Sequence, residues 1–227
     1  MERIAYIRQK EKEYHETCYK EHELFQSGSW LHKPVAFVLE VAEKLDKPLR
    51  ILDLGCGVGR HSIPLAKYGS VDCVDLLPIA LEKLMEYGNQ HNVAHKLTCM
   101  EAEIDTMHIE ENTYDYIVAI SSLEHVSSEA VLRKFLRRMK VGTRANGMHY
   151  FVVNSNIEET DVLTGVKLEP LLEVNMKTED MLALLDDTYR GWTSIKREVK
   201  HLQFTIQRDK QDIHLKTDAI TYVVQRS

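Results

Sequence analysis

The chain has 227 residues, of which 28% are charged and 44% are hydrophobic, which excludes a disordered or low-complexity protein and suits one α/β domain. Its formal net charge of −6 at pH 7 argues against a general affinity for DNA, which proteins hold largely through phosphate contacts. No apolar run approaches the ~20 residues of a membrane-spanning helix, so we expect no contact with a membrane.

The N-terminal residues and the cysteines favour a cytoplasmic protein. We expect this protein to be a monomer or a homodimer. Residues 1–20 are charged throughout and lack the hydrophobic segment of a signal peptide. Cys56 and Cys73 fall where buried residues are expected, which is typical of reduced cysteines that serve in packing. His91 and His95 have the spacing of metal ligands on a helix, but no third ligand is evident, so we expect no metal.

Helical and strand patterns alternate along most of the chain. Helices are predicted at residues 2–25, 34–46, 59–69, 78–91 and 128–140, and strands at 49–54, 71–75, 96–101, 115–120 and 147–153. Alternation of this kind is typical of a doubly wound, mostly parallel α/β sheet. Two runs of alternating polar and apolar residues follow, at 192–207 and 213–225, and they predict an antiparallel hairpin.

The segment Ile51–Arg60 carries the strongest signal for a ligand. A predicted strand leads there into three glycines at alternate positions, beginning with Gly55. Glycine is needed where the backbone takes a positive φ or lies directly against a ligand. Turns that hold a pyrophosphate on a helix N-terminus have the spacing Gly-x-Gly-x-x-Gly instead. Asp53, two residues before the first glycine, would repel a pyrophosphate and attract a cationic ammonium group.

Two further acids end neighbouring predicted strands. Asp75 follows the second strand, where a carboxylate accepts hydrogen bonds from ribose hydroxyls, and Glu103 follows the third. Taken singly, Asp53 has the usual role of a helix cap, Asp75 that of a turn residue and Glu103 that of a solvated charge. Because all three end strands in one alternating pattern, a nucleoside site is favoured over these separate roles.

Residues 49–154 resemble the class I S-adenosylmethionine-dependent methyltransferases. Besides the three acids, the turn Glu111–Asp115 and the segment Ser121–Val126 after the fourth strand are similar to that family. The residues from Gly55 to Gly69 are similar to the small methyltransferases of the tellurite-resistance type and to their small-molecule relatives. The resemblance implies a seven-stranded, mostly parallel, Rossmann-like sheet closed by a C-terminal antiparallel hairpin. It also implies an enzyme whose cofactor is S-adenosylmethionine.

The three acids have separate predicted roles toward this cofactor. Asp53 would face its ammonium group and Asp75 its ribose hydroxyls, and the family likeness assigns Glu103 to the adenine amino group. The full predicted set of cofactor-binding residues is Asp53, Gly55, Cys56, Gly57, Asp75, Leu76, Glu103, Ile104 and Ser121.

We expect a single methyltransferase domain of residues 1–227. Its parts are N-terminal helices that form a cap, the cofactor-binding core, a lid with a helix, and the terminal hairpin, at residues 1–46, 47–154, 155–188 and 189–227. The predicted loop Ser155–Asn175, of about twenty residues, is longer than an ordinary connection. Because ligands in such sheets lie beyond the carboxyl ends of the strands, this loop should cover the methyl group. Tyr14, Trp30 and Asn154 are the predicted substrate or lid residues.

Methyl transfer asks the protein mainly for positioning. The reaction is an in-line displacement, and holding the reacting atoms together in a dry cavity contributes ~7–11 kcal/mol. His125 follows the fourth strand and is the candidate catalytic base for an acceptor that must lose a proton. The alternative, which we favour, is a structural histidine fixed by Glu124 or by the backbone.

Three functions fit the sequence. The first is methyl transfer to a small-molecule acceptor, favoured by the acidity, the modest size and the predicted lid. The second is a methyltransferase that acts on tRNA or protein, which would require an exposed basic or grooved face beside the methyl group. The third is a non-catalytic S-adenosylmethionine-binding protein, which would keep Asp53 and Asp75 but leave no channel to the methyl group.

Overall fold

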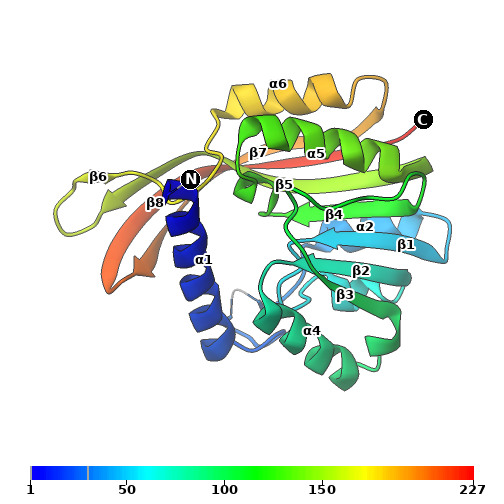
Figure 1. Ribbon diagram of the computed structural model, residues 1–227, viewed down its shortest axis with the longest axis horizontal. Coiled ribbons are helices and arrows are strands. Elements are labelled where there is room, and N and C mark those ends of the chain that lie inside the picture. Colours follow the sequence, from blue (N-terminus) through cyan, green and yellow to red (C-terminus); the bar gives the residue numbers. More distant parts are fainter. Residues whose placement is uncertain (1, 30) are drawn as a thin grey trace.

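The computed structural model describes residues 2–29 and 31–227. One sheet runs through the molecule and carries helices on both faces (Figure 1). Its strands are β1 (Leu49–Leu54), β2 (Gly69–Asp75), β3 (Leu97–Glu101), β4 (Tyr114–Ile120), β5 (Thr143–Asp161), β6 (Lys167–Leu168), β7 (Thr193–Arg208) and β8 (Gln211–Gln225). The α-helices are α1 (Glu2–Glu21), α2 (Ala36–Lys44), α3 (Ser62–Leu65), α4 (Pro78–Gln90), α5 (Glu129–Gly142) and α6 (Thr178–Thr188).

The strand order is β3-β2-β1-β4-β5-β8-β7, in which β1 to β5 are parallel and β8 is antiparallel to both of its neighbours. The predicted class, a mostly parallel sheet closed by a C-terminal hairpin, is confirmed. The seven strands of this path match the predicted number, and the eighth strand, β6, pairs with β5 beside it.

Two hydrophobic cores lie on the two faces of the sheet. In β1, Leu52 packs into the core under α5 and α6, whereas Ile51 packs into the core under α2, α3 and α4. This split follows from the strand pleat, which points successive side chains to opposite faces. Because both faces of β1 are covered by helices, its leucine and isoleucine side chains are all buried, and Arg50 is its one exposed residue.

The predicted loop from Ser155 is wrong in its first part. Strand β5 continues to Asp161, because Glu158–Asp161 pair with the residues Ile213 to Lys216 of β8. The register shifts between Ser155 and Glu158, and the residues that follow are mostly polar, so no strand pattern marks them in the sequence. Pairing with a partner strand has decided the conformation there rather than the local pattern.

Two predicted helices are shorter in the structure. The helix predicted at 59–69 is limited to α3, because the glycine turn takes its first positions and β2 begins at Gly69. The helix predicted at 2–25 ends at Glu21. Among the described residues, no helix is both long and apolar enough to cross a membrane.

Helix α1 stands across the carboxyl ends of β1, β2 and β4 (Figure 1). It buries Ile7 and Tyr19. Near its first turn, Arg3 donates to Glu169 Oε1 at 2.8 Å and to the backbone oxygen of Leu172 at 3.3 Å. The first helix is thus joined to the segment between β6 and α6, far away in the sequence.

Candidate functional site

A cavity of about 440 Å³ lies between α1 and the carboxyl ends of β1, β2 and β4. Its walls are formed by α1, the glycine turn after β1, the end of β2, the loop after β3 and the turn after β4, together with Glu173. Open α/β sheets bind their ligands at this edge, and the volume lies within the usual range for small-molecule sites.

The glycine turn makes two close approaches. Gly55 has a φ of 68°, and a Cβ atom there would lie 2.5 Å from the Ser122 Cβ atom. Gly57 has a φ of 53°, and its Cβ atom would lie 2.9 Å from the hydroxyl oxygen of Tyr19. Both positions therefore require glycine, and the turn presents bare backbone to the cavity, together with Cys56.

Asp75 ends β2 and lines the cavity, as predicted. Its Oδ2 accepts the N–H of Gly57 at 2.8 Å, and its Oδ1 accepts the N–H of Leu77 at 2.9 Å. Burial raises the pKa of this carboxyl, and the two backbone donors oppose that shift. A carboxylate oxygen has more than one lone pair, so Asp75 retains capacity to accept hydrogen bonds from a diol in the cavity.

Asp53 lies behind the glycine turn rather than in the cavity wall. It is 2% exposed, it accepts a hydrogen bond of 2.6 Å from the Ser62 hydroxyl, and it is not among the lining residues. Burial raises the pKa of Asp53 to about 6 in spite of this bond. The predicted attraction of Asp53 for the ammonium group of a ligand stays a prediction, and the glycine turn would lie between the two charges.

The remaining predicted cofactor residues Leu76, Glu103, Ile104 and Ser121 all line the cavity. Glu103 already has a partner, because its Oε1 accepts a hydrogen bond of 3.0 Å from the Arg8 guanidinium of α1. The sequence did not indicate this ion pair, and the role of Glu103 toward adenine stays a prediction.

His125 also lines the cavity, and its Nδ1 lies 3.1 Å from Glu173 Oε2. Burial acts to lower the pKa of His125, but the hydrogen bond with Glu173 and the carboxylates of Glu11 and Glu124 raise it to about 9. The imidazole is therefore a cation at neutral pH. The sequence suggested Glu124 or a backbone group as the partner of His125, whereas the side chain that contacts its ring is Glu173.

The predicted substrate residues are placed differently. Asn154 uses its Nδ2 and its backbone N–H to donate to Glu124, at 2.6 and 3.1 Å, so it is turned away from a role as cavity lining. Tyr14 is 37% exposed and does not line the cavity, whereas Tyr19 does. Trp30 falls outside the described residues.

The sequence predicted that the N-terminal helices form a cap, but it did not identify the residues of α1 that line the cavity. Four of its cavity-lining residues, Arg8, Glu11, His15 and Tyr19, recur every three or four positions, which places them on one helix face. This stripe passes beside Tyr14. These four residues form a polar stripe that ends in a tyrosine. The stripe is hard to recognise in the sequence because the other faces of the helix also carry charged residues.

The groups in the cavity fit a nucleoside with a charged tail. Asp75 offers acceptors for a diol, the turn at Gly57 lines the cavity with backbone that no side chain covers, and Leu76 and Ile104 supply apolar surface for a base. Among the described residues, no group of three or more His, Cys, Asp and Glu side chains is arranged to hold a metal ion.

Comparison with known proteins agrees with this geometry. Residues 51–147 match the family model described as a methyltransferase domain. Residues 51–147 form a methyltransferase domain. The family resemblance drawn from the sequence is confirmed, and S-adenosylmethionine is the cofactor of this family.

The relatives of this methyltransferase domain are distant. The ubiquinone biosynthesis O-methyltransferase of Rickettsia akari is 27% identical over 159 residues, which are 68% of this chain and 61% of that protein. The sterol 24-C-methyltransferase erg6 of Aspergillus fumigatus is 24% identical over 127 residues, 53% of this chain and 34% of that protein. The chain thus spans less than two thirds of the length of either relative.

Among solved structures, TehB from Haemophilus influenzae superposes with a TM-score of 0.64 at 17% sequence identity, over 95% of this chain and 67% of that one. This similarity extends beyond the methyltransferase domain match to nearly the whole chain. At such low identity it establishes the shared fold.

Proposed function

We propose that this chain transfers a methyl group from S-adenosylmethionine to a small-molecule acceptor bound under α1. The supporting observation is that one cavity joins two unlike walls. Asp75 and the bare turn at Gly57 form a nucleoside-binding side, and Glu11 and His125 form a second, polar side. A protein that only binds the cofactor has no need of the second side.

Each predicted cofactor residue has a role in this proposal. Asp75 accepts from the ribose hydroxyls, Glu103 accepts from the adenine amino group, and Asp53 favours the ammonium group through the turn. The residues that lie against the cofactor are Gly55, Cys56, Gly57, Leu76, Ile104 and Ser121. S-adenosylmethionine supplies the activated methyl group.

The remaining work of the chain is to place the acceptor and to exclude water. The nucleophile of the acceptor must approach in line with the bond that breaks, and α1 with Glu173 encloses the space in which it does so. His125 keeps its proton at neutral pH, so we assign it to orienting the acceptor rather than to removing a proton.

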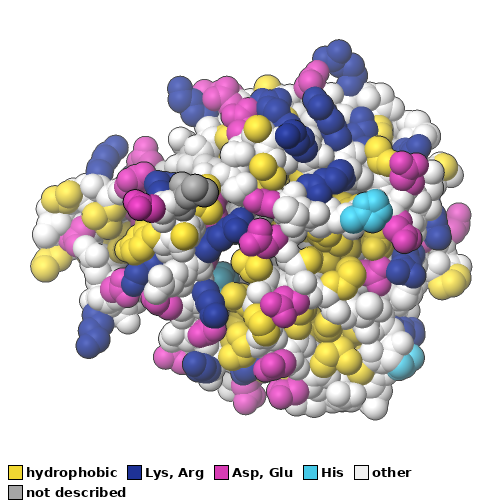
Figure 2. All heavy atoms as spheres, in the orientation of Figure 1, with side chains coloured by type: hydrophobic (Ala, Val, Ile, Leu, Met, Phe, Trp, Pro, Cys, Tyr) yellow, Lys and Arg dark blue, Asp and Glu magenta, His cyan; other side chains and the backbone are white. Residues whose placement is uncertain are grey.

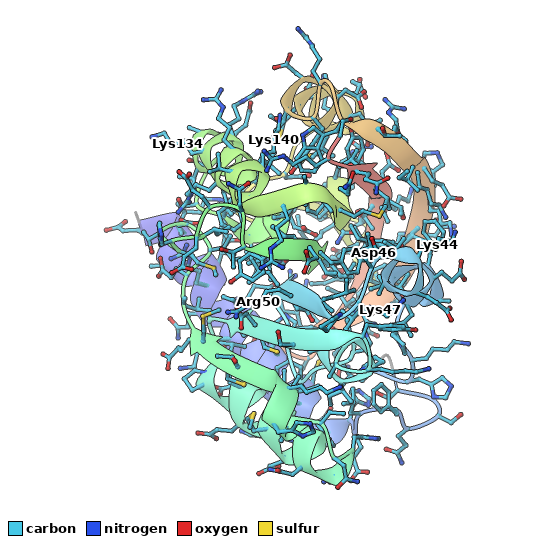
Figure 3. All side chains as sticks on the ribbon, turned by 90° about the vertical axis from the view of Figure 1, so that its right-hand side faces the viewer. Lys44, Asp46, Lys47, Arg50, Lys134 and Lys140 are labelled. Carbon is cyan, nitrogen blue, oxygen red and sulfur yellow. The ribbon has the colours of Figure 1, made fainter. Side chains whose placement is uncertain are left out.

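The charge distribution favours a small acceptor over tRNA. In Figure 2, Lys and Arg side chains gather over α5, where Arg133, Lys134 and Arg137 are exposed and do not line the cavity. Figure 3 shows a second group of basic side chains, Lys44 and Lys47, near the amino end of β1 and thus at the opposite end of the strand from the cavity. Both groups lie where they cannot guide a polyanion to the methyl group.

The test is a label-transfer assay with methyl-tritiated S-adenosylmethionine. The protein is incubated with three acceptor fractions of a cell extract: small molecules, tRNA and proteins. We expect label in the small-molecule fraction, loss of transfer in Asp75→Ala, and unchanged transfer in Lys134→Ala. Label in tRNA or protein would replace the proposed acceptor class, and absence of label from every fraction would argue for a non-catalytic protein.

A further inference from the structure

Arg8 of α1 contacts three carboxylates from two other parts of the chain. Its Nη1 lies 3.0 Å from Glu103 Oε1, its Nη2 lies 3.3 Å from Asp105 Oδ2, and its Nε lies 3.7 Å from Glu173 Oε1. Glu103 and Asp105 follow β3, whereas Glu173 belongs to the segment between β6 and α6. One guanidinium thus joins three segments around the cavity.

The partners of Arg8 reach both sides of the cavity. Glu103 is the acid that we assign to the adenine amino group. Glu173 uses its second oxygen, Oε2, to hold the Nδ1 of His125 at 3.1 Å. The Arg8 side chain therefore stands between the cofactor side and the acceptor side and contacts an acid of each.

The ion pair that Arg3 of α1 makes with Glu169 is more exposed. Arg3 and Glu169 are 48% and 76% exposed, and pairs of this kind contribute little to stability. In contrast, the Arg8 side chain is 25% exposed and that of Glu173 only 2%. Without Arg8, the carboxylates of Glu103, Asp105 and Glu173 would lose the cation that they share, and the buried Glu173 would keep only its pair with His125, which is unfavourable. The position of this part of α1 therefore depends on Arg8 more than on its surface pairs.

We propose that Arg8 is a positioning residue that couples closure of α1 to occupation of the cofactor site. The inference rests on the proposed function. When the adenine amino group donates to Glu103, it fixes that carboxylate, and the carboxylate fixes Arg8 and α1. Glu11 and His15, which lie on the same face of α1, then complete the acceptor side. The cofactor accordingly binds before the acceptor.

Hydrogen exchange of α1 tests the coupling. The amides of residues 2–21 are followed with and without S-adenosylhomocysteine in the intact protein, in Arg8→Gln, and in Arg3→Gln as the matched control. In the intact protein we expect the ligand to slow exchange of α1 by roughly tenfold or more, the effect of hydrogen bonds to charged groups. In Arg8→Gln the ratio of the two rates should fall toward one, and in Arg3→Gln it should be retained.

The ratio distinguishes coupling from simple support. If Arg8 only stabilised α1, Arg8→Gln would speed exchange equally with and without ligand, and an unchanged ratio would overturn the proposal. Arg8→Lys keeps the charge but not the fork of five donors, so it should restore the ratio in part. Glu103→Gln keeps an acceptor for the amino group and loses the ion pair, so it should lower the ratio as Arg8→Gln does.

The two proposals fail separately. If calorimetry finds no binding of S-adenosylhomocysteine to the intact protein, the proposed function is overturned, and the coupling with it. If the intact protein binds the ligand and the ratio for α1 is near one, the cofactor proposal stands and the role of Arg8 is wrong. Thermal melts of each variant show that the measured molecules are folded.

Discussion

Asp75 is the side chain on which the proposed cofactor site depends most directly. Asp75→Ala removes the acceptor for the ribose hydroxyls, so we expect the affinity for S-adenosylhomocysteine to fall by ~1–3 kcal/mol, the usual loss for such hydrogen bonds. Calorimetry measures this, with Asp46→Ala near the amino end of β1 as a control that should bind normally (Figure 3). Equal affinity in Asp75→Ala and the intact protein would remove the ribose assignment.

Gly57 offers a test with a close internal control. A Cβ atom at Gly57 would meet the Tyr19 hydroxyl at 2.9 Å, whereas one at Gly165 would meet nothing within 4 Å, although the φ is positive at both, 53° and 70°. Both substitutions should cost ~1–2 kcal/mol for a left-handed residue, and Gly57→Ala should cost more because its Cβ atom also meets Tyr19. Calorimetry should show weaker cofactor binding in Gly57→Ala and normal binding in Gly165→Ala. Weaker cofactor binding in both variants would contradict the assignment of the turn at Gly57 to the cofactor site.

Asp53 predicts a pH dependence of cofactor binding. Its pKa in the free protein is about 6, and a cation near it favours the charged form and lowers that pKa. Binding should therefore release protons near pH 6, and affinity should rise with pH through this range. Calorimetry in buffers of different ionisation enthalpy measures the release. Asp53→Asn should remove the protons that Asp53 releases. The protons that Asp75 releases should remain, because burial also raises the pKa of Asp75.

His125 predicts a pH dependence of stability with the opposite sign. The pKa is about 9 in the folded chain and ~6.5 in an unfolded one, so the cation is favoured by folding. The stabilisation by its pair with Glu173 is fully present below about pH 6.5 and is lost as pH rises through about 9. Urea unfolding of the intact protein and of His125→Gln should differ most at pH 6 and least at pH 10.

Activity decides whether His125 is also a base. His125→Ala should change turnover per folded molecule little if the residue is structural or orienting, which we expect. A general base would instead cost ~10²–10⁴ in rate. It would also need the neutral imidazole, so the rate would climb with pH toward about 9.

Helix α1 forms one wall of the cavity and is the element whose removal is most informative. Deletion of residues 2–21 should abolish methyl transfer, because Glu11, His15 and the enclosure of the acceptor are lost. Cofactor binding should persist at reduced affinity, since Tyr19 approaches Gly57 but the acids of the core remain. The label-transfer assay measures the first effect and calorimetry the second, and a circular dichroism spectrum shows whether the variant is folded. Complete loss of binding in a folded variant would place α1 within the nucleoside site.

The elements of the core could be predicted because their signals are local. Strand β1 and the turn at Gly55 are marked by an apolar run and by glycines that the close approach to Ser122 requires. The sequence indicated that the N-terminal helices form a cap, but the contacts that hold α1 in place, such as that of Arg8 with Glu173, could not be predicted because the two residues are distant in sequence. The extension of β5 to Asp161 likewise depends on pairing with β8.

The whole molecule has two cores that share one sheet, so it should unfold as one unit. Strand β1 contributes Leu52 to one core and Ile51 to the other, so neither can be lost without the strand. At a hundred times its Kd, S-adenosylhomocysteine should add ~2.7 kcal/mol to the free energy of unfolding. For a chain of this length that corresponds to a rise in Tm of ~5–10 °C. A calorimetric scan with two separate transitions, or with no ligand shift, would contradict this.

The contact of Arg8 with Glu173 also bears on how the protein is made. During translation the first helix leaves the ribosome early, and the glycine turn and the acids of β2 and β3 follow it. The buried carboxylate that α1 needs as a partner is synthesised much later. Until then the newly made helix has a guanidinium without Glu173, and the nascent chain has an open cofactor edge. The pocket can therefore be completed only after Glu173 has been translated, so a product that ends before this residue would contain the recognisable glycine motif without a closed site.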